Sequence, residues 1–279
     1  MSRRIELVQQ LKMDLKKAAS SLSKDEARFL VDTYYLHQKN RIRSFLQVRD
    51  LRKADEPAQV LDDLVEVQRQ IEDVVKLALD HYTRTGMLNQ WARSQTGVGP
   101  VIAAGLCGHI DMEIATTPAK IWRFAGLDPT VTWEPRKKRP WNAALKTLCW
   151  KLGDSFVKSQ SRKNPTYGRI YVERREYEER RNNDGELADQ AEKALAKFAS
   201  SAGRFRKYLE SGKAPDAKSA PKGYWSWWHY QQGKLPPAHL LTRASRYAVK
   251  VFLAHYWEVG REELTGEAVE SCYHHLRQD

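Results

Sequence analysis

The spacing of apolar positions near the start of the chain predicts a long helix that begins at Ser23. A hydroxyl at Ser23 followed by acids at Asp25 and Glu26 is typical of a helix start, because the hydroxyl caps backbone N–H groups and the acids favour the N-terminal dipole. Bulky or apolar positions then alternate by four and three, at Val31, Tyr35, Gln38, Ile42 and Phe45.

A second helix of the same kind follows the break at "RKADEP", where Pro57 suits the first helical turn. Its corresponding positions are Leu61, Leu64, Gln68, Ile71, Val75, Ala78 and Tyr82. We expect an N-terminal helix in residues 1–22 and a long antiparallel helical hairpin, a coiled coil, in residues 23–94. Because heptads on both helices need a partner surface, the hairpin predicts a homodimer.

The remaining chain also has helical periodicity, and the predicted fold class is all-α. Thr117 and Pro118 start a helix that Gly126 stops, and the segment "LDPTVTWEPRKKRP" is expected to be a loop or one short hairpin. Further helices are expected from Trp141 to about Ser161, from "NPTYG" to "NNDG", and from Glu186 to Leu209. We predict a second domain in residues 95–212, a linker at "SGKAPDAKSAPKG", and an aromatic and basic helical segment in residues 213–279.

Charge and aromatic content point to a polyanionic partner. The 279 residues carry 47 Lys and Arg against 35 Asp and Glu, a net charge of +12, together with nine tryptophans. Nucleic acid is the leading partner for such a chain, and a merely basic cytoplasmic protein is the alternative. Cys107, Cys149 and Cys272 fit neither a disulfide framework nor paired metal ligands. Without a signal-like N-terminus or a membrane-length apolar run, we expect a cytoplasmic protein with no membrane partner.

The stretch "TGVGPVIAAGLCGHID" contains a tight turn at Gly97 and Gly99 before a helix of small residues. Such a turn presents backbone N–H groups to a phosphate, as a helix-hairpin-helix element does. The alternative is a turn that lets two helices pack closely.

Three further groups are candidate nucleic-acid-binding residues, because cations neutralise phosphates and aromatic rings stack on exposed bases. The alternative for each group is an ordinary solvated charged face. The first group lies in "WEPRKKRPWNAALKTLCWK" and contains Arg136, Lys137, Lys138, Arg139, Trp141, Lys146 and Lys151. The second contains Arg162, Lys163, Tyr167, Arg169, Tyr171, Arg174 and Arg175. The third is a stripe of Arg243, Arg246 and Lys250 on the C-terminal helix.

The sequence offers no catalytic constellation and calls for no cofactor. It has neither a phosphate-binding loop nor a nucleophile elbow, and its acids are scattered among helical charges. Cys272, His274 and His275 are close in sequence, but adjacent helical residues diverge and no further ligand stands nearby, so a metal site is not predicted.

The run from Gly97 to Pro129 resembles the C-terminal domain of RNA-guided insertion-sequence transposases that carry a DEDD nuclease domain. The same region is similar to the Nop domain of box C/D guide-RNA ribonucleoproteins, in which a helical hairpin precedes the domain. The segment Pro165 to Tyr171, "PTYGRIY", matches a motif downstream in that domain. Thr130 and Thr132 stand where the transposases carry a reactive serine, and the hairpin stands where they carry the nuclease.

A stand-alone unit of this kind resembles the tandem-interspaced-guide-RNA-associated (Tas) proteins of prokaryotes and their viruses. The resemblance implies a Nop-like domain in residues 95–212 and a nuclease-free protein that binds a guide RNA and targets DNA by base pairing. Two alternatives stay open. One is a diverged transposase or recombinase that acts on DNA, and the other is a DNA-binding structural protein that uses no RNA.

Overall fold

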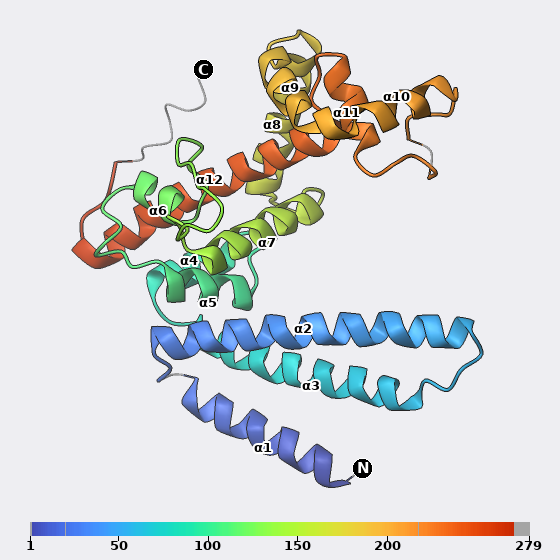
Figure 1. The fold of residues 1–279 in the computed structure, drawn as a ribbon. Coiled ribbons are helices and arrows are strands. Elements are labelled where there is room, and N and C mark those ends of the chain that lie inside the picture. The colour runs from blue at the N-terminus through green and yellow to red at the C-terminus, as the bar shows by residue number, and fades with distance from the viewer. Residues whose placement is uncertain (1, 20, 217, 271–279) are drawn as a thin grey trace. The chain divides into compact units, whose positions relative to one another are not determined.

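The protein, described here from a computed structural model, is built from helices (Figure 1). The structure describes residues 2–19, 21–216 and 218–270, and none of these residues forms a strand, so the predicted all-α class is confirmed. The first helices are α1 (Ser2–Ala18), α2 (Lys24–Lys53), α3 (Gln59–Tyr82), α4 (Met87–Ser94), α5 (Pro100–His109) and α6 (Pro118–Phe124). The later ones are α7 (Ala143–Ser159), α8 (Thr166–Asn183), α9 (Ala188–Leu195), the 3₁₀ helix η1 (Ala196–Ser201), α10 (Ala202–Glu210), α11 (Tyr224–Gln231) and α12 (Pro237–Thr265).

The chain forms two compact units that differ from the four predicted segments. Unit 1 combines Met1–Ser155 with Lys250–Asp279, and unit 2 is Phe156–Val249. Unit 1 therefore contains the predicted N-terminal helix, the predicted hairpin and the front of the predicted second domain. The proposed linker "SGKAPDAKSAPKG" lies inside unit 2.

In unit 1, α2 and α3 run side by side in opposite directions (Figure 1). The predicted start of α2 is confirmed: the Ser23 side chain accepts a hydrogen bond from the Glu26 N–H, and the Glu26 carboxylate accepts one from the Ser23 N–H. This reciprocal capping box satisfies two N–H groups that the first helical turn leaves unpaired.

The heptad pattern fails on the far half of α2. Ile42 and Phe45 are 48% and 56% exposed, whereas the buried positions there are Ser44 and Val48. Two polar pairs join the middle of α2 to α3. Arg41 Nε lies 2.6 Å from an oxygen of the buried Glu72 carboxylate, and His37 hydrogen-bonds to Gln68. These pairs occupy the side of α2 that faces α3, and Ile42 and Phe45 lie on the outer side.

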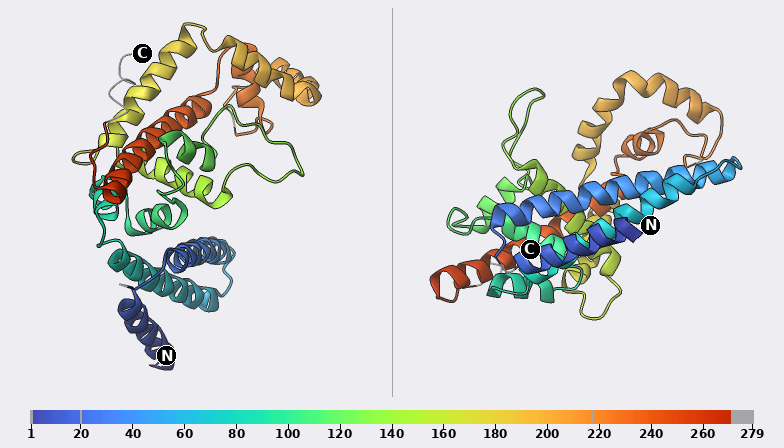
Figure 2. Two further views of the ribbon diagram at one scale, coloured as in Figure 1. Left: turned by 90° about the vertical axis from the view of Figure 1, so that its left-hand side faces the viewer. Right: turned by 90° about the horizontal axis from the view of Figure 1, so that it is seen from below.

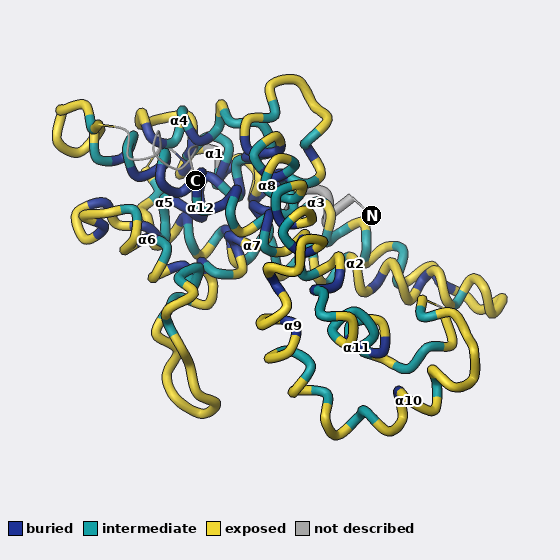
Figure 3. The backbone as a smooth tube through the Cα atoms, turned by 90° about the horizontal axis from the view of Figure 1, so that it is seen from above, coloured by how far each residue is buried: buried dark blue, intermediate teal, exposed yellow. Residues whose placement is uncertain are grey.

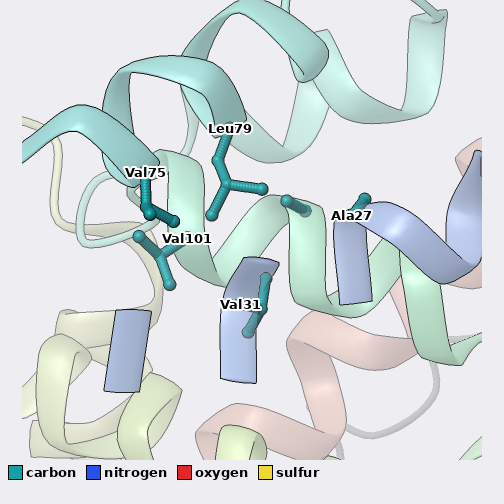
Figure 4. Packing of buried hydrophobic residues seen from close by; sticks show 6 residues of the cluster. Ala27, Val31, Val75, Leu79 and Val101 are labelled. Atoms are coloured by element: carbon teal, nitrogen blue, oxygen red, sulfur yellow. The ribbon is translucent and has the colours of Figure 1, made fainter. Parts of the chain in front are cut away.

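The start of α2 and the end of α3 pack against α5 through a small apolar core (Figure 4). Gly105 of α5 lies against α7, since a methyl group at that position would lie 2.7 Å from the Leu148 side chain. A methyl at Gly108 would lie 3.1 Å from the Lys24 carbonyl oxygen. The members of this core are Ala27, Val31, Val75, Leu79, Val101 and Ala104.

The second half of α12 returns to unit 1 and closes it over α4 and the α5–α6 connection. The rings of Phe252 and Trp91 lie 5.4 Å apart, and Trp257 Nε1 donates to the Ala115 carbonyl at 2.6 Å. Glu263 accepts hydrogen bonds from the Met87 and Leu88 N–H groups, which caps α4. These contacts explain why residues far apart in sequence belong to one unit.

Unit 2 has two apolar clusters. The first joins α9 to the start of α12 through Leu187, Ala191, Leu235 and Leu240. The second is aromatic and contains Phe205, Tyr224 and Trp227. The predicted helix from Glu186 to Leu209 is interrupted, because η1 separates α9 from α10.

Candidate nucleic-acid interface

The loop between α6 and α7 in unit 1 carries the most exposed group of predicted binding residues. It projects from the helices of its unit (Figure 2), and residues 132–140 are all exposed (Figure 3). Arg136, Lys137, Lys138 and Arg139 occupy this exposed part. Glu134 pairs with Lys137 at 2.8 Å, which leaves the four cations in clear excess over the local negative charge.

The loop begins at a turn that only glycine accommodates well. Gly126 has φ +65°, and a methyl group there would lie 2.9 Å from both the Trp141 ring and the Lys146 side chain. The Asn142 N–H donates to the Phe124 carbonyl at 2.8 Å, which brings the two ends of the loop together. The bare backbone at Gly126 therefore lets the Trp141 ring lie over the turn.

Two tryptophans brace the loop. The Trp133 and Trp141 rings meet edge to face with centroids 6.4 Å apart, and Trp133 Nε1 donates to the Lys137 carbonyl at 2.7 Å. The Arg139 guanidinium lies 5.5 Å from the Trp133 ring centroid. Arg136 has φ +73°, a strained conformation for a non-glycine residue. The aromatic pair thus holds the cationic segment in one shape.

The loop is also fixed at its beginning. Asp128 Oδ1 accepts from the Thr130 N–H at 2.9 Å and from the Thr130 hydroxyl at 2.7 Å. These hydrogen bonds stabilise the carboxylate and lower the pKa of Asp128. Thr130 is therefore held in this turn by the Asp128 side chain.

Three other predicted cations of unit 1 lie over aromatic rings. The distances from ammonium nitrogen to ring centroid are 4.0 Å for Lys146 over Trp141, 3.9 Å for Lys151 over Tyr35, and 4.2 Å for Lys250 over Trp122. All three lysines are half-buried, so they are less accessible to a polyanion than the loop cations.

The glycine turn connects α4 to α5 directly. Gly97 has φ +97°, and its carbonyl accepts a hydrogen bond from the Ser155 hydroxyl. Gly99 is the N-cap of α5, and a methyl group added there would meet no atom within 4 Å. Close packing therefore explains Gly105 and Gly108 but not Gly99.

The predicted nucleic-acid-binding residues of unit 2 are of two kinds: exposed cations, and side chains that are partly or fully buried. Arg162, Lys163, Arg169 and Arg246 are exposed. Arg174 and Arg243 are only about a quarter exposed and both contact the buried Glu178 carboxylate, at 2.7 Å and 2.9 Å. Arg175 lies 3.5 Å from Glu179.

Tyr167 and Tyr171 do not belong to the candidate interface. They are 2% and 3% exposed, and the Tyr167 ring stacks on Phe156 with centroids 5.0 Å apart. Helical spacing correctly placed both rings on one face of α8, but that face is turned to the interior. This burial corrects their assignment to nucleic-acid binding.

Neither sequence spacing nor charge identified Glu178 as a central residue. It is 1% exposed and also lies 3.9 Å from Arg181. The Arg174 guanidinium lies 4.7 Å from the Tyr177 ring centroid and 4.5 Å from that of Tyr247. The positive charge of these arginines is thus used to hold α8 and α12 together.

Among the residues that the structure describes, no group of three His, Cys, Asp or Glu side chains is arranged to hold a metal ion. Cys272, His274 and His275 lie outside the described residues. No helix in the described part of the chain is both long and apolar enough to cross a membrane.

Comparisons with family models, curated proteins and solved structures found no match for the chain. The α6–α7 loop and its surroundings are therefore the features of the molecule from which its function is inferred.

Proposed function

We propose that this chain is a guide-RNA-binding protein that forms a ribonucleoprotein and reaches target DNA through base pairing by the RNA, with no nuclease activity of its own. The observation that carries the proposal is the exposed loop with cations at residues 136–139, braced by Trp133 and Trp141. Contiguous exposed cations bind phosphates without reading sequence, which suits a protein whose RNA does the reading.

The loop favours single-stranded over duplex nucleic acid. Trp133 is 38% exposed and lies among the cations rather than in the core. Exposed rings beside cations bind single strands, since unpaired bases can stack on them while the phosphates meet the charges. A duplex offers its phosphates but keeps its bases stacked.

The finer features of the fold belong to the same proposal. We infer that α2 and α3 form the coiled-coil hairpin and that the helices after it form a Nop-like domain, with the Gly97–Gly99 turn as its helix-hairpin-helix-like element. Ile42, Phe45 and Leu46 are exposed, and Phe45 and Leu46 lie three and four positions after Ile42, so both neighbour it on the outer side of α2. A second copy of the chain would cover them in a homodimer.

The proposal is tested by fluorescence anisotropy with three labelled probes of matched length: single-stranded RNA, single-stranded DNA and duplex DNA. We expect the RNA to bind most tightly at physiological salt. Tightest binding to duplex DNA with no preference for RNA would instead support the DNA-binding structural protein. Cleavage or strand exchange of the DNA probes would support the transposase or recombinase.

A further inference from the structure

A pocket of 420 Å³ lies in unit 1 between the end of α5 and helix α6. Its volume is within the range of small-molecule sites, about 300–1,000 Å³. The lining residues include His109, Asp111, Ile114, Lys120, Arg123 and Phe124. Its walls are mostly apolar, and its charged groups are two cations and one carboxylate.

The apolar wall of the pocket includes two large apolar side chains that are not buried in the core. Ile114 is 71% exposed and Phe124 is 43% exposed. Phe124 is the last residue of α6, and its ring has no aromatic partner among the ring contacts of the described residues. A flat apolar ligand would cover these side chains and gain the free energy of their burial.

The polar groups of the pocket suit a neutral, hydrogen-bonding ring. Burial lowers the pKa of His109, and the nearby positive charge of Arg28 adds to this effect, so the imidazole is neutral at physiological pH. His109 Nδ1 is buried and has no hydrogen-bond partner. One oxygen of the Asp111 carboxylate accepts from the Glu113 N–H at 2.9 Å, and the other is an acceptor for a ring N–H such as that of uracil or thymine. Lys120 and Arg123 are donors that also attract phosphate.

The pocket is next to the basic α6–α7 loop both in the amino-acid sequence and in space. Pro140, which follows Arg139 directly, is one of its lining residues. Phe124, another lining residue, accepts a hydrogen bond through its carbonyl from the Asn142 N–H. The loop cations and the pocket therefore lie within one continuous part of unit 1.

We propose that this pocket holds one unstacked base of a single-stranded nucleic acid whose phosphates lie along the basic loop. The inference rests on the proposed function, because it needs a single strand at residues 136–139. It adds a defined base-binding site to what would otherwise be contact with phosphates alone. Phe124 stacks on the base, and Lys120 and Arg123 meet the flanking phosphates.

The experiment uses the full chain and a short fluorescein-labelled oligouridine, with oligodeoxythymidine as the DNA arm. Phe124→Ala removes the stacking ring, and Phe124→Tyr keeps an aromatic ring at the same place. Phe29→Ala is the matched control, because Phe29 is an aromatic residue 69% exposed on α2 that does not line the pocket. Circular dichroism of each variant establishes that it is folded.

We expect Phe124→Ala to weaken binding by about 5- to 160-fold, which corresponds to the loss of one base–aromatic stack. Phe124→Tyr and Phe29→Ala should bind as the unchanged chain does. In the unchanged chain, 4-thiouridine placed in the oligouridine should photocrosslink to pocket residues. This last measurement does not depend on any variant folding.

The outcomes separate the inference from the proposed function. If oligouridine binds and binding depends on the loop cations, but Phe124→Ala has no effect and crosslinks lie elsewhere, the pocket assignment is wrong and the proposed function stands. If the unchanged chain binds neither probe, both are wrong. If Phe124→Ala weakens the binding of oligodeoxythymidine but not that of oligouridine, the pocket binds a base of the DNA strand.

Discussion

Arg243 of α12 donates through Nε to the buried carboxylate of Glu178 on α8, across 2.9 Å and 65 positions of sequence. Arg174 donates to the other oxygen of the same carboxylate from one helical turn away. One acid thereby satisfies two arginines and joins two helices of unit 2.

Replacing Glu178 should destabilise unit 2 more than replacing either arginine. Glu178→Gln leaves Arg174 and Arg243 without their counter-charge, and we expect a loss of about 3 kcal/mol in the free energy of unfolding. Arg243→Met should cost less, because Glu178 keeps Arg174. Urea unfolding of the full chain followed by circular dichroism measures both. Equal stability of Glu178→Gln and the unchanged chain would show that the cluster does not stabilise the fold.

Gly126→Ala should disturb the base of the loop. The substitution forces a side chain into the left-handed region, which costs about 1–2 kcal/mol, and it also brings a methyl group against Trp141. Gly185→Ala is the matched control, since Gly185 has φ +82° but open space around it. Thermal unfolding should show a larger loss for Gly126→Ala, accompanied by altered tryptophan fluorescence. Equal losses would mean that contact with Trp141 does not matter.

Removing the loop cations should reduce the salt dependence of RNA binding. For single strands the slope of log K against log salt is about 0.7 per phosphate neutralised, so alanine at Arg136, Lys137, Lys138 and Arg139 should lower its magnitude by up to about 3. A control variant replaces four exposed lysines of unit 2 with alanine, namely Lys207, Lys213, Lys218 and Lys222. If the control lowers the slope as much as the loop variant does, the loop is not the specific binding element.

The outer side of α2 should determine the oligomeric state. Glutamate at Ile42 and Phe45 would place two charges in the proposed dimer contact, where burying them unpaired is costly. Light scattering should then report a monomer, whereas the unchanged chain and Phe29→Glu remain dimeric. A monomeric unchanged chain at micromolar concentration would contradict the dimer.

Local signals predicted much of this fold. The Ser23 cap, the Thr117 cap of α6 and the stop at Gly126 depend on residues within one or two turns, and each occurs as predicted. The exposed loop after Gly126 follows from its prolines and charges. The corresponding part of the candidate interface, residues 136–139, could therefore be predicted from sequence.

Features that depend on distant residues could not be predicted in this way. Ile42 and Phe45 lie on the outer side of α2, whereas Arg41 contacts Glu72 of α3, 31 positions further along the chain. The burial of Tyr167 and Tyr171 follows from packing against residues outside their helix. The pocket beside Phe124 forms only when the end of α5 meets α6, although an aromatic residue next to Arg123 on a short helix is a signal that could have marked it.

The proposed binding of a guide RNA is tested most directly by purifying the chain from cells that naturally produce it, with RNases inhibited, and sequencing the RNA that remains bound. We predict a discrete, short, repeat-derived RNA, whose complement would identify the target. Heterogeneous RNA, or no RNA, would contradict the account and favour a DNA-binding relative of the transposases.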